Sequence, residues 1–290
     1  MPTTTKNNIE EKTRTAGSAR ILTALIALPI LIVAIVVPAL QLLFVALAAV
    51  AIGLGLFEFY RLARLRDIKP DLSAMYIASA ALFTISYIND LATSLVLTQL
   101  VLLVLTIGTL SAFTLRGAPF DKMIASTATT ILGVLYVSWL GSHLVSLKTG
   151  FSAVLSTHLI SFFFLVLMGS DTGAYYFGRA FGKHKLAPSV SPGKTWEGVA
   201  GGFVAGLLFA TLSHFWFFRE LPLKWTLLLA AVMTAVGILG DLTESALKRG
   251  AGAKDAAKLL PGHGGILDRL DSLLFNAPLI YYFARFYFNK

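Results

Sequence analysis

Cysteine is absent from this chain of 290 residues, and charged residues make up only 13% of it. The absence of cysteine excludes disulfide bonds, thiolate metal sites and a cysteine nucleophile. Hydrophobic residues account for 56% of the chain and the mean hydropathy is +0.76, whereas soluble domains are about 25% charged and about 45–50% apolar. The composition therefore indicates an integral membrane protein.

The net charge of +9 would suggest a nucleic-acid partner if the chain were soluble. In a membrane protein, an excess of Lys and Arg is typical of a cytoplasmic surface that faces anionic lipid headgroups. We therefore expect the lipid bilayer as a partner and no nucleic acid.

Apolar runs long enough for membrane spans recur along the chain and predict an all-α polytopic fold, since each span needs about 20 residues. Residues 1–20 form a polar tail, and the apolar run from Ile21 to Phe57 is too long for a signal peptide. We expect transmembrane scaffold helices in 21–150 and a catalytic region in 151–290, with loops at 179–196 and 248–271. About nine spans are expected, at 21–37, 41–57, 74–88, 96–114, 124–145, 157–178, 197–217, 225–247 and 272–288.

The Lys and Arg residues divide unevenly between the two sides of such a fold. With a cytoplasmic N-terminus, 19 of the 24 fall on the cytoplasmic side and five on the other. This asymmetry predicts that the C-terminus lies outside and that the two large loops face the cytoplasm. We expect the cell inner (cytoplasmic) membrane as the location.

A polar stripe ends the predicted span at 225–247. Its residues fall at i, i+3, i+4, i+7 and i+8, which is one helical face; they are Asp241, Glu244, Ser245, Lys248 and Arg249. Basic residues at a span end can simply snorkel to the interface. Snorkelling does not explain the deeper Asp241, so we favour a polar pocket with acids for a cation and bases for phosphate.

The segment "PGHGGILDRLDS" precedes the last span. Gly264 and Gly265 allow backbone amides to approach an anion, whereas His263 alone is a weak ligand signal. Asp268 and Asp271 share a helical face, and negative residues in a first turn are also ordinary capping. Hard oxygen donors without cysteine favour Mg²⁺ over zinc.

The segment "SVSPGKTWEG" contains Gly-Lys-Thr but lacks the preceding glycine and strand of a P-loop. We expect Ser191 to be a helix N-cap, which gathers Lys194, Thr195 and free amides at a helix start suited to phosphate. A plain capped helix is the alternative. Asp171 is expected to be buried deep in an apolar span, where ionisable groups are usually functional.

Residues 245–271 resemble the signature of the phosphatidate cytidylyltransferases, or CDP-diacylglycerol synthases. The signature runs Ser-x-hydrophobic-Lys-Arg, four residues, Lys-Asp, a small residue, then hydrophobic-Pro-x-His-Gly-Gly-x-x-Asp-Arg-x-Asp. Every specified position is met, by Ser245, Lys248, Arg249, Lys254, Asp255, Ala257, Leu260, Pro261, His263, Gly264, Gly265, Asp268, Arg269 and Asp271. "SDTGAYYFGRAFGKHK" and "SPGKTWEG" are also similar to family segments.

The resemblance implies transfer of a cytidylyl group from CTP to phosphatidic acid, which gives CDP-diacylglycerol and pyrophosphate. It implies Asp241 and Asp268 as Mg²⁺ ligands and as catalytic residues together with Lys248 and Arg269. The substrate phosphates would be bound by Ser191, Lys194, Thr195, Ser245, Arg249, Lys254, His263, Gly264 and Gly265, with Asp171, Glu244, Asp255 and Asp271 in support. The resemblance also implies a homodimer.

Two other functions remain open from the residues alone. A membrane lipid or polyprenol kinase that uses CTP would need similar phosphate-binding groups but would release CDP. An ion-coupled transporter would place broken spans in both halves, whereas polar residues concentrate in the C-terminal half of this chain.

Overall fold

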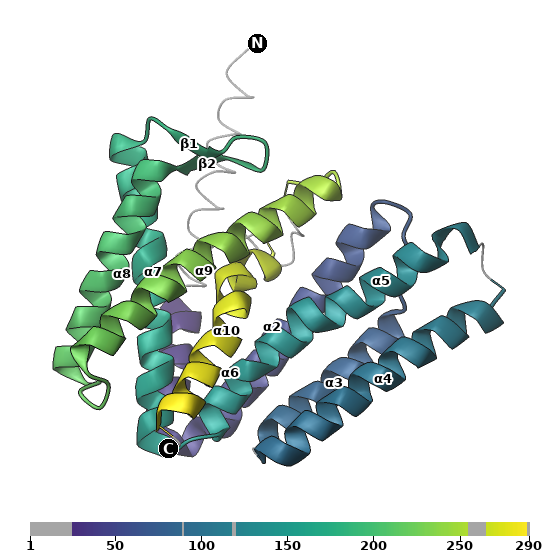
Figure 1. Cartoon of the computed structure of the whole chain (residues 1–290), viewed down its shortest axis with the longest axis horizontal. Coiled ribbons are helices and arrows are strands. Elements are labelled where there is room, and N and C mark those ends of the chain that lie inside the picture. The colour runs from purple at the N-terminus through teal and green to yellow at the C-terminus, as the bar shows by residue number, and fades with distance from the viewer. Residues whose placement is uncertain (1–24, 89, 118–119, 255–264, 289–290) are drawn as a thin grey trace, which may run out of the picture.

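A computed structural model describes residues 25–88, 90–117, 120–254 and 265–288. These residues are almost entirely helical, and successive long helices run in opposite directions (Figure 1). The helices are Leu25–Val36, α2 (Gln41–Arg64), α3 (Leu72–Ile88), α4 (Leu91–Leu115), α5 (Met123–Gly133), α6 (Leu140–Thr149), α7 (Ala153–Phe181), α8 (Trp196–Trp216), α9 (Leu223–Gly250) and α10 (Leu267–Phe288). Short 3₁₀ turns are η1 (Pro38–Leu40) and η2 (Phe120–Lys122), and the π-helical turn η3 (Val134–Trp139) makes α5 and α6 continuous.

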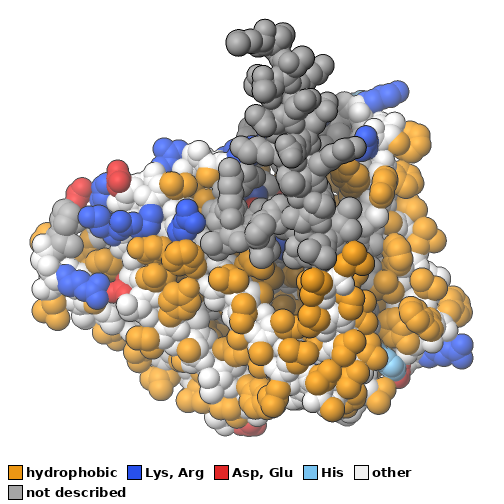
Figure 2. Space-filling model, turned by 180° about the vertical axis from the view of Figure 1, so that it is seen from behind, with side chains coloured by type: hydrophobic (Ala, Val, Ile, Leu, Met, Phe, Trp, Pro, Cys, Tyr) orange, Lys and Arg blue, Asp and Glu red, His pale blue; other side chains and the backbone are white. Residues whose placement is uncertain are grey.

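The predicted helical membrane fold is confirmed. Within the described residues, six helices are long and apolar enough to cross a bilayer: Pro38–Arg64, Ala92–Leu115, Phe120–Thr149, Ala153–Phe181, Trp196–Trp216 and Leu223–Gly250. Leu25–Val36 and Leu72–Ile88 are shorter apolar helices. On the face in Figure 2, hydrophobic side chains cover the middle and lower surface, while most Lys and Arg side chains gather higher up.

The segment after α7 differs from the expected loop and helix start. It forms a small hairpin in which β1 (Lys185–Ala187) pairs antiparallel with β2 (Ser191–Thr195). The hairpin is a small local addition to an otherwise all-α protein, and the expectation that Ser191 is the helix N-cap is wrong. Pairing with β1 keeps Ser191 extended, and α8 begins later, where Thr195 Oγ1 accepts a hydrogen bond from Gly198 N at 3.1 Å.

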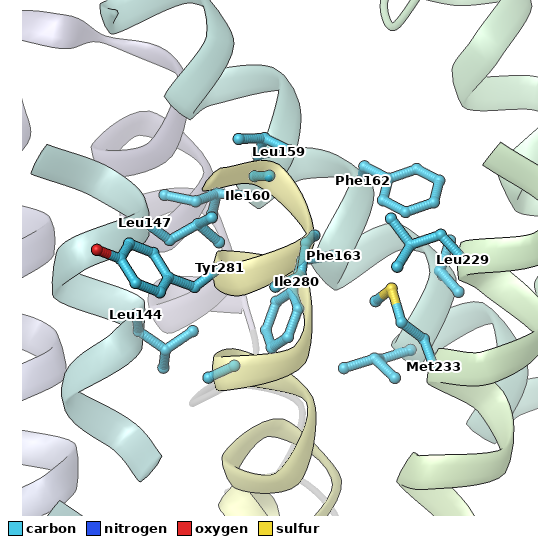
Figure 3. Close-up of a cluster of buried hydrophobic side chains, with 14 of the residues drawn as sticks. Leu144, Leu147, Leu159, Ile160, Phe162, Phe163, Leu229, Met233, Ile280 and Tyr281 are labelled. Carbon is cyan, nitrogen blue, oxygen red and sulfur yellow. The ribbon is translucent and has the colours of Figure 1, made fainter. Parts of the chain in front are cut away.

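Helix α10 lies in the middle of the main hydrophobic core (Figure 3). Its Ile280 and Tyr281 pack among residues of α6, α7 and α9, which are Leu144, Leu147, Leu159, Ile160, Phe162, Phe163, Leu229 and Met233. A helix surrounded by three others is fixed in position by their packing, because protein interiors are close-packed. This core therefore fixes the start of α10 relative to the end of α9, where the signature residues lie.

Candidate active site

A cavity of about 670 Å³ opens among α7, the β-hairpin, the start of α8, α9 and α10. Eight of the predicted site residues line it: Asp171, Ser191, Lys194, Thr195, Asp241, Asp268, Arg269 and Asp271. The cavity therefore joins groups that are up to about a hundred positions apart in the sequence, and it mixes acids with bases.

One wall of the cavity is an ion pair between the hairpin and α9. Lys194 Nζ of β2 lies 2.5 Å from Asp241 Oδ2 of α9. Ser245, one turn further along α9, donates from its Oγ to Asp241 Oδ1 at 3.4 Å. The extended backbone of β2, rather than a helix start, places Lys194 against Asp241.

A second ion-pair group joins α9 to α10. Lys248 Nζ lies 2.6 Å from Glu244 Oε2 and 2.7 Å from Asp268 Oδ1. The other Asp268 oxygen accepts from Gly265 N at 3.0 Å. Glu244 is 1% exposed and Lys248 14% exposed, so this group holds its geometry away from solvent. Of the five residues of the expected polar stripe on α9, only Asp241 lines the cavity, while Glu244 and Lys248 form this separate group with Asp268.

Asp171 does not lie buried in an apolar environment, as the sequence had suggested. It is an exposed residue on α7 and faces the cavity. Its apolar sequence neighbours did not predict this exposure, because exposure depends on which elements pack against that side of α7. Asp271 also lines the cavity, and its Oδ1 accepts from Ser272 N at 2.6 Å.

The remaining predicted residues surround this centre or fall outside the described part of the chain. Arg249 Nε donates to Val190 O at 3.2 Å, which ties the end of α9 to the hairpin connection. Lys254 is exposed and is not among the lining residues of the cavity. Three predicted residues, Asp255, His263 and Gly264, lie outside the described residues.

Close helix contacts make the cavity possible. A Cβ added at Gly240 of α9 would lie 2.5 Å from Asp271 O of α10. Only glycine permits this backbone approach, which brings the acids of the two helices to the same cavity.

Comparison with known proteins identifies the family. Residues 18–287 match the cytidylyltransferase family. The chain belongs to this family. It is similar to a phosphatidate cytidylyltransferase of Synechocystis sp., with 34% identity over 268 residues that cover 83% of this chain and 88% of that protein. A Staphylococcus saprophyticus phosphatidate cytidylyltransferase is 39% identical over 196 residues, 67% of this chain and 70% of that protein.

A Haemophilus influenzae phosphatidate cytidylyltransferase is 46% identical over 134 residues, 45% of this chain and 46% of that protein. In that alignment, as in those with several other curated relatives, the chain spans about half of the relative's length. The shorter alignments have the higher identities, so similarity within the family is strongest in one part of the chain.

Among the lining residues of the cavity, the side chains able to bind a metal ion are aspartates, whose oxygen atoms suit a hard cation. Within the described residues, no three Asp, Glu or His side chains converge into a ready-made metal site. Asp241 and Asp268 are each held by a lysine and line the same cavity. This arrangement fits Mg²⁺, because proteins usually bind that ion through one or two carboxylates, with water and substrate phosphates as the other ligands.

The sequence interpretation missed Glu58, which lies just beyond the expected span at 41–57. Helix α2 continues to Arg64, and Glu58 is fully buried at 0% exposure. Its two carboxylate oxygens accept from Ile266 N at 2.9 Å and from Leu267 N at 2.8 Å. The available signal was one acid in the apolar run "GLGLFEFY", since such a residue needs a partner when it is buried.

Proposed function

We propose that this protein transfers a cytidylyl group from CTP to phosphatidate and forms CDP-diacylglycerol and pyrophosphate. The observation that carries this function is one cavity in which Asp241 of α9 and the signature residues Asp268, Arg269 and Asp271 of α10 meet the Lys194 segment. A phosphate oxygen of phosphatidate attacks the α-phosphorus of CTP, and the bond from that phosphorus to the bridging oxygen of the β-phosphate breaks. No side chain needs to be activated as a nucleophile, because the lipid phosphate already carries negative charge.

The main task of the protein is then to hold two polyanions together, as in other phosphoryl-type transfers. Lys194 supplies positive charge at the cavity and holds Asp241, while Lys248 lies behind the lining and holds Asp268. The remaining proposed phosphate contacts are Ser191, Thr195, Ser245, Arg249, Lys254, His263, Gly264, Gly265 and Arg269. Asp171, Glu244, Asp255 and Asp271 support these groups.

Asp241 and Asp268 are the proposed holders of Mg²⁺ or another hard divalent cation. When bound, the ion neutralises phosphate charge and stabilises the leaving pyrophosphate. The two lysines hold these carboxylates in place by ion pairs until substrate phosphates arrive.

The proposed placement is a nine-span protein of the inner membrane with a cytoplasmic N-terminus and an external C-terminus. Connections between helices alternate between the two ends of the molecule. The last residues of α2, α4, α7 and α9 share the end that carries the hairpin, and the longer connections, 65–71, 116–122, 182–195 and 251–266, follow them in the sequence. These connections hold most of the loop Lys and Arg residues, which supports the cytoplasmic assignment of the cavity.

Cysteine labelling tests this orientation, because the chain has no native cysteine. A cysteine at Lys185 of the hairpin should resist an impermeant reagent added outside intact cells. A cysteine at Lys224, at the other end of the molecule, should react. The opposite pattern would invert the topology and place the cavity outside.

Product analysis tests the activity itself. Purified protein with labelled CTP, phosphatidate and Mg²⁺ should yield CDP-diacylglycerol and pyrophosphate. Phosphorylated lipid with CDP would instead show a CTP-dependent kinase, and no lipid product with ion uptake in vesicles would favour a transporter. Mass measurement of the same preparation tests the predicted homodimer.

A further inference from the structure

Glu58 connects the half of the molecule outside the cavity to the first turn of α10. Its carboxylate is fully buried, and each oxygen accepts one backbone hydrogen bond, from Ile266 N and Leu267 N. The next backbone donor upstream, Gly265 N, binds Asp268 Oδ2. Three consecutive backbone amides at this helix start therefore donate to two carboxylates, those of Glu58 and Asp268, and Asp268 lines the cavity.

This arrangement determines where Asp268 can point. The first amides of a helix have no partner within the helix, and a buried one without a partner is strongly unfavourable. Glu58 satisfies two of them from another helix and also complements the positive end of the helix dipole. If this carboxylate were lost, the first turn could relax and move Asp268 relative to Lys248.

The turn that follows α2 also contacts the other end of the same signature segment. Arg66 Nε donates to Gly250 O at 2.8 Å, at the last residue of α9. Closer to Glu58, a Cβ added at Gly55 would lie 3.2 Å from Leu270 Cδ1 of α10. Helix α2 and the turn after it thus contact both the first turn of α10 and the residue where α9 ends.

We propose that Glu58 is a positioning residue of the active site, which sets the orientation of Asp268 through the first turn of α10. This inference rests on the proposed function for its link to catalysis. The carboxylate has a specific advantage over an amide here. Glutamine offers one acceptor oxygen, and its NH₂ group would face the second backbone N–H, so it satisfies only half of the pair.

Asp71 provides a matched control, because it is also a buried acid that caps a helix. It is 8% exposed, accepts from Ala74 N at 2.9 Å at the start of α3, and pairs with Arg116 Nη1 at 2.6 Å. It is not among the residues that line the cavity. Asp71→Asn and Glu58→Gln therefore each remove one negative charge from a helix start. Only Glu58 binds the helix start that carries Asp268.

The test compares the two variants as purified full-length proteins. Glu58→Gln should lower kcat about ten- to hundredfold, since a displacement of about 1 Å at a site can cost about 10²-fold. It should also raise the Mg²⁺ concentration needed for half-maximal activity, and excess Mg²⁺ should restore part of kcat. Asp71→Asn should lower the melting temperature but leave the Mg²⁺ response unchanged.

A readout independent of turnover separates this inference from the proposed function. Mg²⁺ with CTP should raise the melting temperature of the wild type and of Asp71→Asn, but raise that of Glu58→Gln much less. If the wild type makes no CDP-lipid, the proposed function fails. The rise in melting temperature with Mg²⁺ and CTP, compared between wild type and Glu58→Gln, still decides the role of Glu58. An unchanged shift and Mg²⁺ response in Glu58→Gln would overturn the positioning role.

A second variant covers the case in which Glu58→Gln does not fold. Glu58→Asp keeps the charge and withdraws the carboxylate by one methylene, so it should show a smaller loss in the same direction. A folded Glu58→Asp with wild-type Mg²⁺ dependence and ligand-induced shift would equally overturn the inference.

Discussion

The two halves of the molecule bury polar groups in different ways. In α2 to α6, buried hydroxyls mostly bond within their own helix, as Thr109 Oγ1 does to Leu105 O and Thr130 Oγ1 to Ser126 O. In α7 to α10, charged groups pair between elements, as Lys194 does with Asp241 and Lys248 with Asp268. Every residue that lines the large cavity lies between positions 170 and 272.

This difference shows how a membrane fold separates support from chemistry. A hydroxyl that bonds to its own helix carbonyl can be buried anywhere along a span. A buried charge needs a partner from a neighbouring element, so charges concentrate where several elements meet. Buried charges of the first half follow the same rule, since Glu58 binds the start of α10 and Asp71 pairs with Arg116 at the end of α4.

Removal of the acids in the second half should have the largest effect. Asp241→Asn and Asp268→Asn should each lower kcat by about 10²–10³-fold, because each loses a preorganised charge. The double variant should be little worse than either single variant if both act on one cation, and EDTA should abolish activity. Turnover at limiting Mg²⁺ and melting in detergent would be measured together.

Two variants provide the contrast in the same measurement. Asp71→Asn, in the first half, should retain near-normal turnover. Asp271→Asn, in the second half, should lower turnover less than substitution of either proposed cation ligand. If folded Asp241→Asn and Asp268→Asn turned over normally, the cavity acids would not hold a cation.

Loss of Lys194, the hairpin lysine that pairs with Asp241, should have an intermediate effect on turnover. Lys194→Gln removes a charge-assisted contact to Asp241, and such contacts contribute about 1.5–3 kcal/mol, or about ten- to hundredfold in rate. Lys185→Gln, on the exposed neighbouring strand, is the control and should change kcat/KM little. Equal losses in both variants would indicate a general charge effect rather than a specific pair.

Helix packing in the second half should be sensitive to one methyl group. A Cβ added at Gly173 of α7 would lie 2.6 Å from Gly201 O of α8, and backbone cannot move aside cheaply. Gly173→Ala should destabilise the protein by about 1–3 kcal/mol. Gly108→Ala in α4, whose Cβ would meet nothing within 4 Å, should be neutral or slightly stabilising in detergent melting. Equal melting temperatures would contradict this difference in packing.

The smallest expected effect is a pH dependence confined to the first half. Burial alone would raise the pKa of Asp71, but hydrogen bonds from Ala74 N and Arg116 outweigh it and hold the pKa below the usual 3.8. A lowered folded-state pKa adds stability that is complete above the ordinary value and lost as the pH falls through the lowered one. The melting difference between wild type and Asp71→Asn should therefore shrink below about pH 4. A constant difference would argue against the ion pair with Arg116.

Sequence reasoning succeeded where a local pattern carries the information. The helical period brought Asp241, Glu244 and Lys248 to one side of α9, and the fixed spacing of the signature indicated the family before any fold was known. It failed at Ser191 because two residues could serve as caps, and strand pairing with Lys185–Ala187 favoured Thr195. It also failed at Asp171, because burial depends on what packs against each side of a helix.

The sequence by itself determined a helical membrane protein of the cytidylyltransferase family and most of the charged residues that line its cavity. Hydropathy and residue spacing are properties of neighbouring positions, so they can be read without a fold. Only the tertiary structure decided which charges pair, that the Lys194 segment is a strand, and that Glu58 binds the start of α10 across 208 positions. Such pairings arise because a buried charge takes whichever partner the packing of distant helices brings within about 3 Å, and no local pattern encodes that choice.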